Sequence, residues 1–246
     1  MITWIHGLFG APTDFSAVAK RLTVPRRQAS MPLPGHGGSP SLDHVSRPAF
    51  GEVAQAFIAS LDALEISDTA LIGYSMGARV AMHIARDYPE RISELVVIGG
   101  HPGLDGDDAR TGRQMLDRKR ANRIRGGGLE AFLESWYLQP LFDRFRAHPD
   151  FDRIVEDRGA GDDHGVATTL ERLSTGHQEP LQAQMTECSV PTLWVVGAED
   201  TRYLKLLTPL AEAQDVGQLA VIPDAGHAVI TEAPEALADV LNDFFT

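Results

Sequence analysis

The sequence of 246 residues contains one cysteine, Cys188, and only three lysines. A single cysteine cannot form an intrachain disulfide or a thiolate metal cluster, so neither is expected. No stretch reaches the roughly 18 apolar residues that a membrane-spanning helix needs. The net charge of −12 disfavours nucleic acid as a partner, because phosphate contacts require a concentrated cationic surface.

The opening residues MITWIHGLFG lack the basic and then apolar pattern of a secretory signal, so a cytoplasmic location is expected. Arginine takes the place of the missing lysine, and 11 arginines fall between residues 101 and 185. Acidic residues outnumber the cations in that stretch, which excludes a broad basic surface. Two interpretations stay open: a few arginines converge on anionic groups, or they form a solvated helical face.

Short β-rich runs alternate with helical patterns along most of the chain, which is typical of a parallel sheet covered by helices on both faces. The sequence therefore predicts an α/β fold. Apolar spacing of three and four residues predicts helices at 53–64, 77–87 and 234–245. Six strands are expected near residues 2–5, 27–31, 70–73, 95–98, 192–196 and 219–222.

The alternation stops between residues 101 and 184, where no strand pattern is found. Helical spacing appears at 129–137 and 166–173, and glycine-rich connections are predicted at 126–128 and 159–165. We interpret residues 101–184 as a helical cap inserted into a core formed by residues 1–100 and 185–246. The cap is expected to lean over one edge of the sheet.

The strongest chemical signal is the pentapeptide GYSMG at residues 73–77, between the apolar strand TALI and the helical run ARVAMHIA. A sharp strand-to-helix turn exposes its central residue at the carboxyl end of the sheet, and the glycines let neighbouring backbone pass close by. This pattern predicts that Ser75 is a nucleophile or base. The alternative is a glycine-rich turn with a capping serine.

A reactive serine hydroxyl needs a base, and the base needs an acid that orients it; in this architecture they follow in the order serine, acid, histidine. His227 comes just after the last predicted strand, and Asp200 holds the equivalent place after the strand at 192–196. Glu199 and Asp224 are the rival acids, but a shift of one residue is expected to turn each of them away.

Backbone N–H groups of Met76 and Leu8 are the expected donors to a developing oxyanion. His6, beside Gly7, is interpreted as a structural part of the same turn. His101 is the one other histidine whose position after a strand end makes it worth testing. No metal-ligand motif and no phosphate-binding loop is present, so no metal and no cofactor are expected.

With HG after the first strand, GYSMG at the turn, Asp200 and His227, the chain resembles the α/β-hydrolase superfamily over nearly its whole length. Members of that superfamily usually carry two strands before the HG strand. Here the HG strand begins at residue 2, so the sheet is expected to hold six strands, all parallel, without the usual antiparallel strand.

Six segments also resemble the 2-succinyl-6-hydroxy-2,4-cyclohexadiene-1-carboxylate synthase family of menaquinone biosynthesis. Two of the segments, GGHPGL and the WYLQP of SWYLQPLF, lie in the otherwise variable cap region. The segments are MPLPGHGGS (31–39), GYSMGARVAM (73–82), GGHPGL (99–104), RTGRQMLDRKRANR (110–123), SWYLQPLF (135–142) and GAEDTRY (197–203).

The resemblance implies a lyase that expels pyruvate from a cyclohexene ring carrying three carboxylates, with a small anionic tricarboxylate as its partner. It implies a triad that acts as a base without forming an acyl-enzyme. A serine hydrolase of an ester, thioester or carbon–carbon bond is the alternative. A small-molecule binding protein on the same fold is the third hypothesis. The resemblance implies substrate-binding roles for Arg79, Arg113, Trp136 and Arg158. Tyr74 lies beside Ser75 in the sequence, and two interpretations stay open for it: it lines the substrate pocket, or it serves packing.

Overall fold

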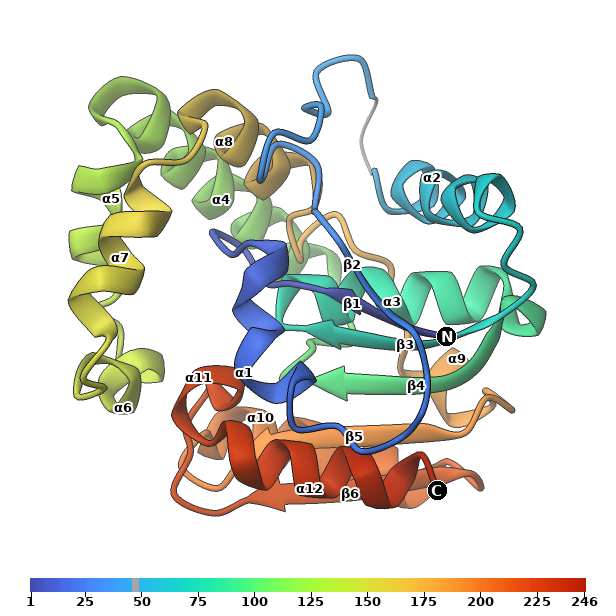
Figure 1. Cartoon of the computed structure of the whole chain (residues 1–246). Helices are drawn as coiled ribbons and strands as arrows, with labels where there is room; N and C mark the ends of the chain where they lie inside the picture. The colour runs from blue at the N-terminus through green and yellow to red at the C-terminus, as the bar shows by residue number, and fades with distance from the viewer. Residues whose placement is uncertain (46–48) are drawn as a thin grey trace.

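The computed structural model describes residues 1–45 and 49–246, and these form a six-stranded sheet in the order β2-β1-β3-β4-β5-β6 (Figure 1). Every neighbouring pair of strands is parallel. The predicted fold class and the all-parallel sheet are therefore confirmed. The strands are β1 (Ile2–Ile5), β2 (Gln28–Met31), β3 (Thr69–Tyr74), β4 (Ile92–Ile98), β5 (Thr192–Gly197) and β6 (Gly217–Ile222).

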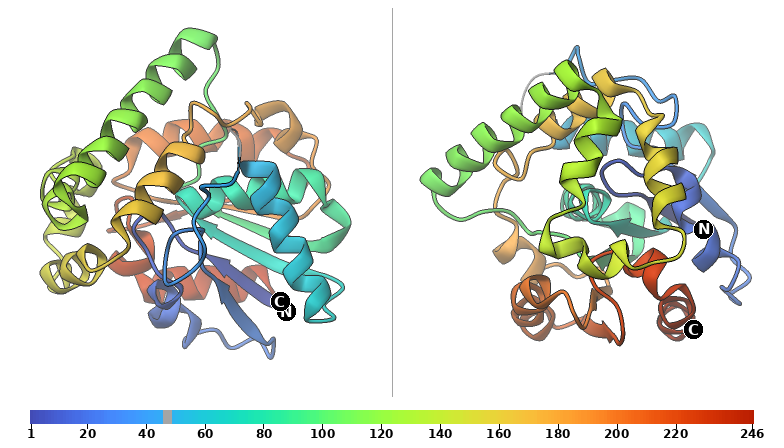
Figure 2. Two further views of the ribbon diagram at one scale, coloured as in Figure 1. Left: turned by 90° about the horizontal axis from the view of Figure 1, so that it is seen from above. Right: turned by 90° about the vertical axis from the view of Figure 1, so that its left-hand side faces the viewer.

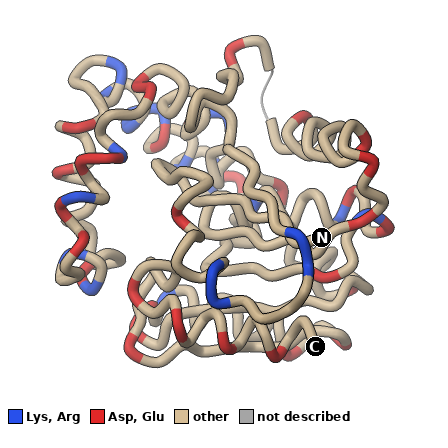
Figure 3. Tube along the Cα trace, in the orientation of Figure 1, with Lys and Arg blue, Asp and Glu red and all other residues tan. Residues whose placement is uncertain are grey.

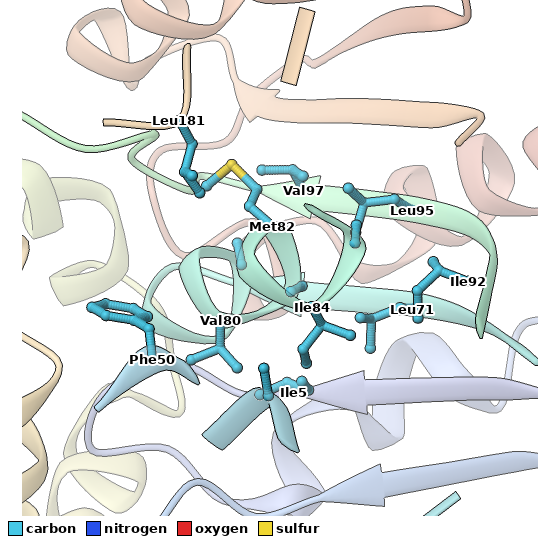
Figure 4. Close-up of a cluster of buried hydrophobic side chains, with 14 of the residues drawn as sticks. Ile5, Phe50, Leu71, Val80, Met82, Ile84, Ile92, Leu95, Val97 and Leu181 are labelled. Atoms are coloured by element: carbon cyan, nitrogen blue, oxygen red, sulfur yellow. The ribbon is translucent and has the colours of Figure 1, made fainter. Parts of the chain in front are cut away.

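One face of the sheet is covered by α3, whose residues 76–85 are all buried and which contributes to the largest buried cluster. Figure 4 shows Val80, Met82 and Ile84 of this helix among residues of the sheet such as Leu71 and Leu95. Each such side chain contributes about 1.5–3 kcal/mol by leaving water. The helices of this face are α2 (Phe50–Ala63), α3 (Met76–Asp87), α9 (Gln182–Thr186) and α10 (Thr201–Ala213).

The opposite face packs a second cluster around Phe15, Trp4 and Leu237. Pro234 begins its longest helix, as the sequence predicted, because proline lacks the N–H that would have no partner in a first turn. The helices of this face are α1 (Ser16–Ala19), α11 (Val229–Glu232) and α12 (Pro234–Phe244). Short 3₁₀ turns occur elsewhere along the described chain as well as here, at η1 (Pro12–Phe15), η2 (Pro89–Arg91) and η3 (Pro140–Phe142).

Five further helices between β4 and β5 lie beyond the carboxyl ends of the strands (Figure 1; Figure 2). They share a third apolar cluster, which Phe9 and Ala228 of the two adjoining turns also enter. Charged residues of both signs are interleaved along them (Figure 3). These inserted helices are α4 (Asp107–Gly127), α5 (Leu129–Trp136), α6 (Asp143–Arg146), α7 (Phe151–Gly159) and α8 (Asp163–Arg172).

The two predicted glycine-rich connections are partly wrong. Residues 126–127 form the last turn of α4, and only Gly128, with φ of 83°, makes the bend into α5. The second connection shrinks to residues 160–162, because α7 runs through Gly159 and α8 begins at Asp163. None of the described helices has both the length and the apolar character required to cross a membrane.

Candidate active site

Ser75 stands between β3 and α3 with φ of 52°, in the left-handed region that a residue with a side chain rarely adopts. Its N–H donates to the carbonyl of Ile98 at 2.8 Å, which ties the turn to the neighbouring strand. A Cβ on Gly77 would lie 2.1 Å from the Ile5 carbonyl oxygen, and one on Gly73 would strike the backbone of α3 at 2.5 Å. Both glycines are thus required for the bend that exposes Ser75.

The structure brings Ser75, His227 and Asp200 into one hydrogen-bonded row. His227 Nε2 lies 3.1 Å from Ser75 Oγ, and His227 Nδ1 lies 2.7 Å from Asp200 Oδ2. The other oxygen of Asp200 accepts from the Tyr203 N–H at 3.2 Å. A carboxylate facing Nδ1 keeps the proton there, so Nε2 is left to accept from the serine hydroxyl. His227 and Asp200 are both buried.

Neither rival acid faces the histidine. The carboxylate of Glu199 pairs with Arg144 Nη1 at 2.6 Å, on the side of the loop away from the buried row. Asp224 is exposed and occupies a tight turn with φ of 51°. Of the three acids, only Asp200, which caps the N-terminus of α10, directs its side chain to His227.

The two predicted oxyanion donors belong to segments next to Ser75. A Cβ on Gly7 would meet the Tyr74 ring at 3.0 Å and Ser75 Cβ at 3.4 Å, so the turn that carries Leu8 runs directly past the serine. Met76 is the first residue of α3, and the N–H of a first helical residue has no acceptor within its helix. The positive end of the helix dipole also favours negative charge at this place.

Two buried histidines hold the turn around Leu8. His6 Nδ1 donates to the Gly7 carbonyl at 2.8 Å, and its Nε2 accepts from the Leu33 N–H at 3.0 Å. His36 Nε2 accepts from the Phe9 N–H at 3.2 Å. Burial lowers the pKa of both rings to about 4. Both nitrogens of His6 are committed to backbone groups, in agreement with a structural role.

Arg79 lies one helical turn after Ser75 and is buried. Its Nη1 donates to the Leu173 carbonyl at 2.7 Å, and its guanidinium stands 5.8 Å from the centre of the Phe50 ring. Burial, and next the charge of Arg113, lower the pKa of Arg79 to about 10. The side chain therefore keeps its positive charge at neutral pH although water has been excluded from it.

Arg113 and His101 lie in the same positively charged region. Burial, and then the charges of Arg79, Arg202 and Arg113, lower the pKa of His101 to about 4. His101 Nδ1 accepts from the Gly103 N–H at 3.1 Å, which leaves the proton of the neutral ring on Nε2.

Tyr203 is a site residue that the sequence reasoning missed. Its ring centre lies 4.8 Å from that of His227 and 6.3 Å from that of His101. Burial raises the pKa of its hydroxyl. The sequence feature that could have indicated Tyr203 was its place three residues after Asp200 in GAEDTRY. At that spacing its N–H donates to the Asp200 carboxylate, which caps α10.

Two aromatic rings of the inserted segment contact the core, Trp136 at the turn after β1 and Phe142 of η3 at His227. Trp136 meets Phe9 edge-on with ring centres 5.3 Å apart, and the guanidinium of Arg120 lies 4.8 Å above the indole. Phe142 meets the His227 ring edge-on at 6.0 Å. The inserted helices therefore supply an apolar wall beside the imidazole.

Arg158 lies apart from the triad. It donates to Asp14 Oδ2 at 3.2 Å and to the Tyr137 hydroxyl at 2.5 Å, and these neighbours raise its pKa despite burial. It lines a cavity of about 630 Å³ together with Phe9 and Asp14, and none of the triad residues lines that cavity. Its predicted role in substrate binding stays a prediction.

Tyr74 is buried beside Ser75, with its ring centre 5.7 Å from that of His227. Burial raises the pKa of its hydroxyl well above the usual value. Within the described residues, no group of three or more histidine, cysteine, aspartate or glutamate side chains is arranged to hold a metal ion.

A model of the alpha/beta hydrolase family matches residues 4–240, and the chain belongs to this family.

Two of its relatives match nearly the whole of this chain. The chain is 31% identical over 240 residues to 2-succinyl-6-hydroxy-2,4-cyclohexadiene-1-carboxylate synthase of Enterobacter sp. (strain 638), covering 98% of this chain and 89% of that protein. It is 30% identical over 258 residues to Protein PHYLLO, chloroplastic, of Arabidopsis thaliana, covering 99% of this chain but 15% of that protein. The resemblance noted in the sequence is thus confirmed.

Among solved structures, MenH from S. aureus matches with a TM-score of 0.93 and 24% identity, covering 99% of this chain and 92% of that one. At this level of identity the match shows the fold. The family and its relatives support an enzyme that acts on a small molecule.

Proposed function

We propose that the chain is a carbon–oxygen lyase of menaquinone biosynthesis. It would eliminate pyruvate from 2-succinyl-5-enolpyruvyl-6-hydroxy-3-cyclohexene-1-carboxylate and release 2-succinyl-6-hydroxy-2,4-cyclohexadiene-1-carboxylate. The observation that carries the proposal is Arg79, a buried cation one helical turn from Ser75 whose hydrogen-bonded partner is a neutral carbonyl. Burying such a charge is costly unless an anion compensates it. An anionic substrate supplies that compensation, and a neutral ester does not.

The first step is removal of the acidic ring proton beside the succinyl ketone. His227, oriented by Asp200, takes the proton of the Ser75 hydroxyl through Nε2, and the serine oxygen takes the proton from the ring carbon. The electron pair left on carbon moves onto the ketone oxygen and gives an enolate. No covalent bond forms between Ser75 and the substrate.

The N–H groups of Leu8 and Met76 are proposed to stabilise the enolate by donating to its oxygen. Return of the electron pair forms a double bond between C2 and C3 of the ring, moves the existing double bond from C3–C4 to C4–C5, and breaks the C5–oxygen bond to the enolpyruvyl group. The departing enolpyruvate takes up the proton held by His227, which restores the neutral imidazole, and becomes pyruvate. Neither metal nor cofactor is needed for this sequence of steps.

Substrate carboxylates are assigned to Arg79 and Arg113, whose forked guanidinium groups suit bidentate binding of carboxylate. Trp136 and Tyr74 form apolar walls of the pocket, and Arg158 is proposed for the third carboxylate. Residues 101–184 are proposed to act as the cap that closes the pocket against water.

The test is to supply the enolpyruvyl substrate and follow pyruvate release together with the absorbance of the diene product. The native chain is expected to turn it over, and Arg79→Ala is expected to lower kcat/KM by about 100-fold, the effect of losing a buried charge-assisted pair. Arg86→Ala is the matched control, because Arg86 lies on the same helix but pairs with Asp87 at the surface. No diene from the native chain, or wild-type kinetics in Arg79→Ala, would contradict the proposal.

A serine hydrolase of an ester, thioester or carbon–carbon bond is the second candidate, since the geometry of Ser75, His227 and Asp200 serves acyl transfer equally well. It would give a burst of product from an activated ester, followed by rapid steady turnover. Labelling of Ser75 by a fluorophosphonate is expected under both functions and does not separate them.

A further inference from the structure

A buried carboxylate on α4 lies behind the proposed substrate-binding arginines. Asp117 is 0% exposed and has no part in the reaction proposed above. It accepts hydrogen bonds from Arg113 Nε at 2.7 Å, Arg120 Nη1 at 3.0 Å and Ser174 Oγ at 2.7 Å. A buried charge with this many donors has one favoured arrangement, because losing any partner leaves it unsatisfied. Asp117 therefore fixes the direction of the Arg113 side chain.

The turn that follows α8 reaches both arginines. The carbonyl of Leu173 accepts from Arg79 Nη1 at 2.7 Å. The next residue, Ser174, donates to Asp117, which in turn holds Arg113. Two consecutive residues thus connect Arg79 of the core helix α3 with Arg113 of the inserted helix α4. The distance between the two guanidinium groups is set through this turn.

The arrangement leaves Arg113 available to a ligand. Its Nε is engaged by Asp117, whereas the structure gives its two terminal nitrogens no acceptor in the described part of the chain. Arg113 is also close enough to Arg79 for its charge to lower the pKa of Arg79. Two cations held near each other in a region of low dielectric repel, so their positions must be enforced.

We propose that Asp117 and Ser174 form a positioning element that holds Arg113 at a set distance from Arg79, so that the pair selects a ligand with two anionic groups at that spacing. The inference rests on the proposed function only in taking the two arginines to bind substrate carboxylates. Neither Asp117 nor Ser174 touches the reacting atoms. Loss of either residue weakens substrate binding and leaves the chemical step intact.

Two substitutions and a control test the element by steady-state kinetics on the enolpyruvyl substrate. Asp117→Asn removes the charge at constant shape and is expected to raise KM at least about tenfold, while kcat stays within about twofold. Ser174→Ala removes one neutral donor and is expected to raise KM about threefold. Glu171→Gln is the matched control, because Glu171 also pairs with two arginines of α4, Arg118 and Arg125. Its KM is expected to match that of the native chain.

A double-mutant cycle separates positioning from a general effect on folding. If Asp117 acts through Arg113, the double variant Asp117→Asn with Arg113→Ala has the KM of Arg113→Ala alone. Additive effects, or a fall in kcat at constant KM, would overturn the inference. The same cycle with Ser174→Ala decides the question should Asp117→Asn fail to fold.

The cycle also separates this inference from the proposed function. Wild-type kinetics in Arg113→Ala would contradict the assignment of that arginine to a substrate carboxylate. A defective Arg113→Ala together with a native KM in both Asp117→Asn and Ser174→Ala would leave the function standing and remove the positioning element.

Discussion

The sheet core and the inserted helices hold their functional residues in different ways. In the core, the geometry of the backbone positions the functional residues. Ser75 has a positive φ and lies near Gly77, whose α-carbon has no room for a side chain. His227 and Asp200 each follow the end of a strand. In the inserted helices, side chains position one another through buried ion pairs and contacts between a cation and an aromatic ring, as with Asp117 and Trp136. In the proposed function, backbone geometry therefore positions the reacting groups, and side-chain networks position the groups that bind substrate.

The largest effect is expected where the core carries the reaction. Ser75→Ala should lower kcat by at least about 10⁴-fold, because the triad works as a unit. Ser75→Gly should be equally inactive yet more stable by about 1 kcal/mol, since glycine adopts positive φ without strain. Steady-state kinetics and urea unfolding measure the two effects. A Ser75→Gly chain no more stable than the native one would show that the turn stores no strain.

A pair of glycine substitutions compares the two regions directly. Gly77→Ala should lower the free energy of unfolding by about 3 kcal/mol or more, because the new Cβ would lie 2.1 Å from the Ile5 carbonyl oxygen. Gly112→Ala in α4 meets no atom within 4 Å and should raise it by about 0.5–1 kcal/mol. Chemical unfolding curves of both variants measure the contrast. Equal changes in the free energy of unfolding of the two variants would contradict this difference between the regions.

Acid should weaken the core through its neutral histidines. The pKa of His6 and of His36 is about 4 in the folded chain, against 6.5 for an ordinary histidine. Between these values the unfolded chain binds protons that the folded chain does not, so stability is complete above pH 6.5 and falls as the pH drops toward 4. The loss is about 3 kcal/mol per histidine by pH 4.

Urea unfolding between pH 7 and pH 4.5 measures this loss. His36→Asn should reduce the slope of stability against pH in that window. Above pH 7 the native chain and the variant should show the same slope, which serves as the internal control. An unchanged slope below pH 6.5 would mean that His36 is not the source.

The smallest effect is expected from a surface ion pair on the inserted helices. Arg153 donates to Asp157 at 3.2 Å, but the two side chains are 63% and 69% exposed. Arg153→Ala should change the free energy of unfolding by less than about 0.5 kcal/mol. Thermal unfolding at low and high salt measures it, and a loss of several kcal/mol would show that exposed pairs also hold these helices.

Much of the core could be predicted because its signals are local. Short β-rich runs between helical patterns indicated the six strands, and glycines two residues before and after Ser75 indicated the turn. The helix α4 was missed because only Asp117, Ala121 and Ile124 along it are buried, which is too few to produce a helical apolar period. The prediction at 126–128 was wrong because glycine that ends a helix and glycine in a loop look alike in sequence.

The sequence by itself determined the α/β alternation and the turn that carries Ser75, since each is specified by its immediate neighbours. Only the tertiary structure decided that Asp200, and neither Glu199 nor Asp224, faces His227. It also decided that Arg79 and Arg113 are connected by the turn of Leu173 and Ser174, the first of which contacts Arg79 and the second of which contacts the partner of Arg113. Such contacts join residues far apart in the chain, and their geometry depends on how whole helices pack.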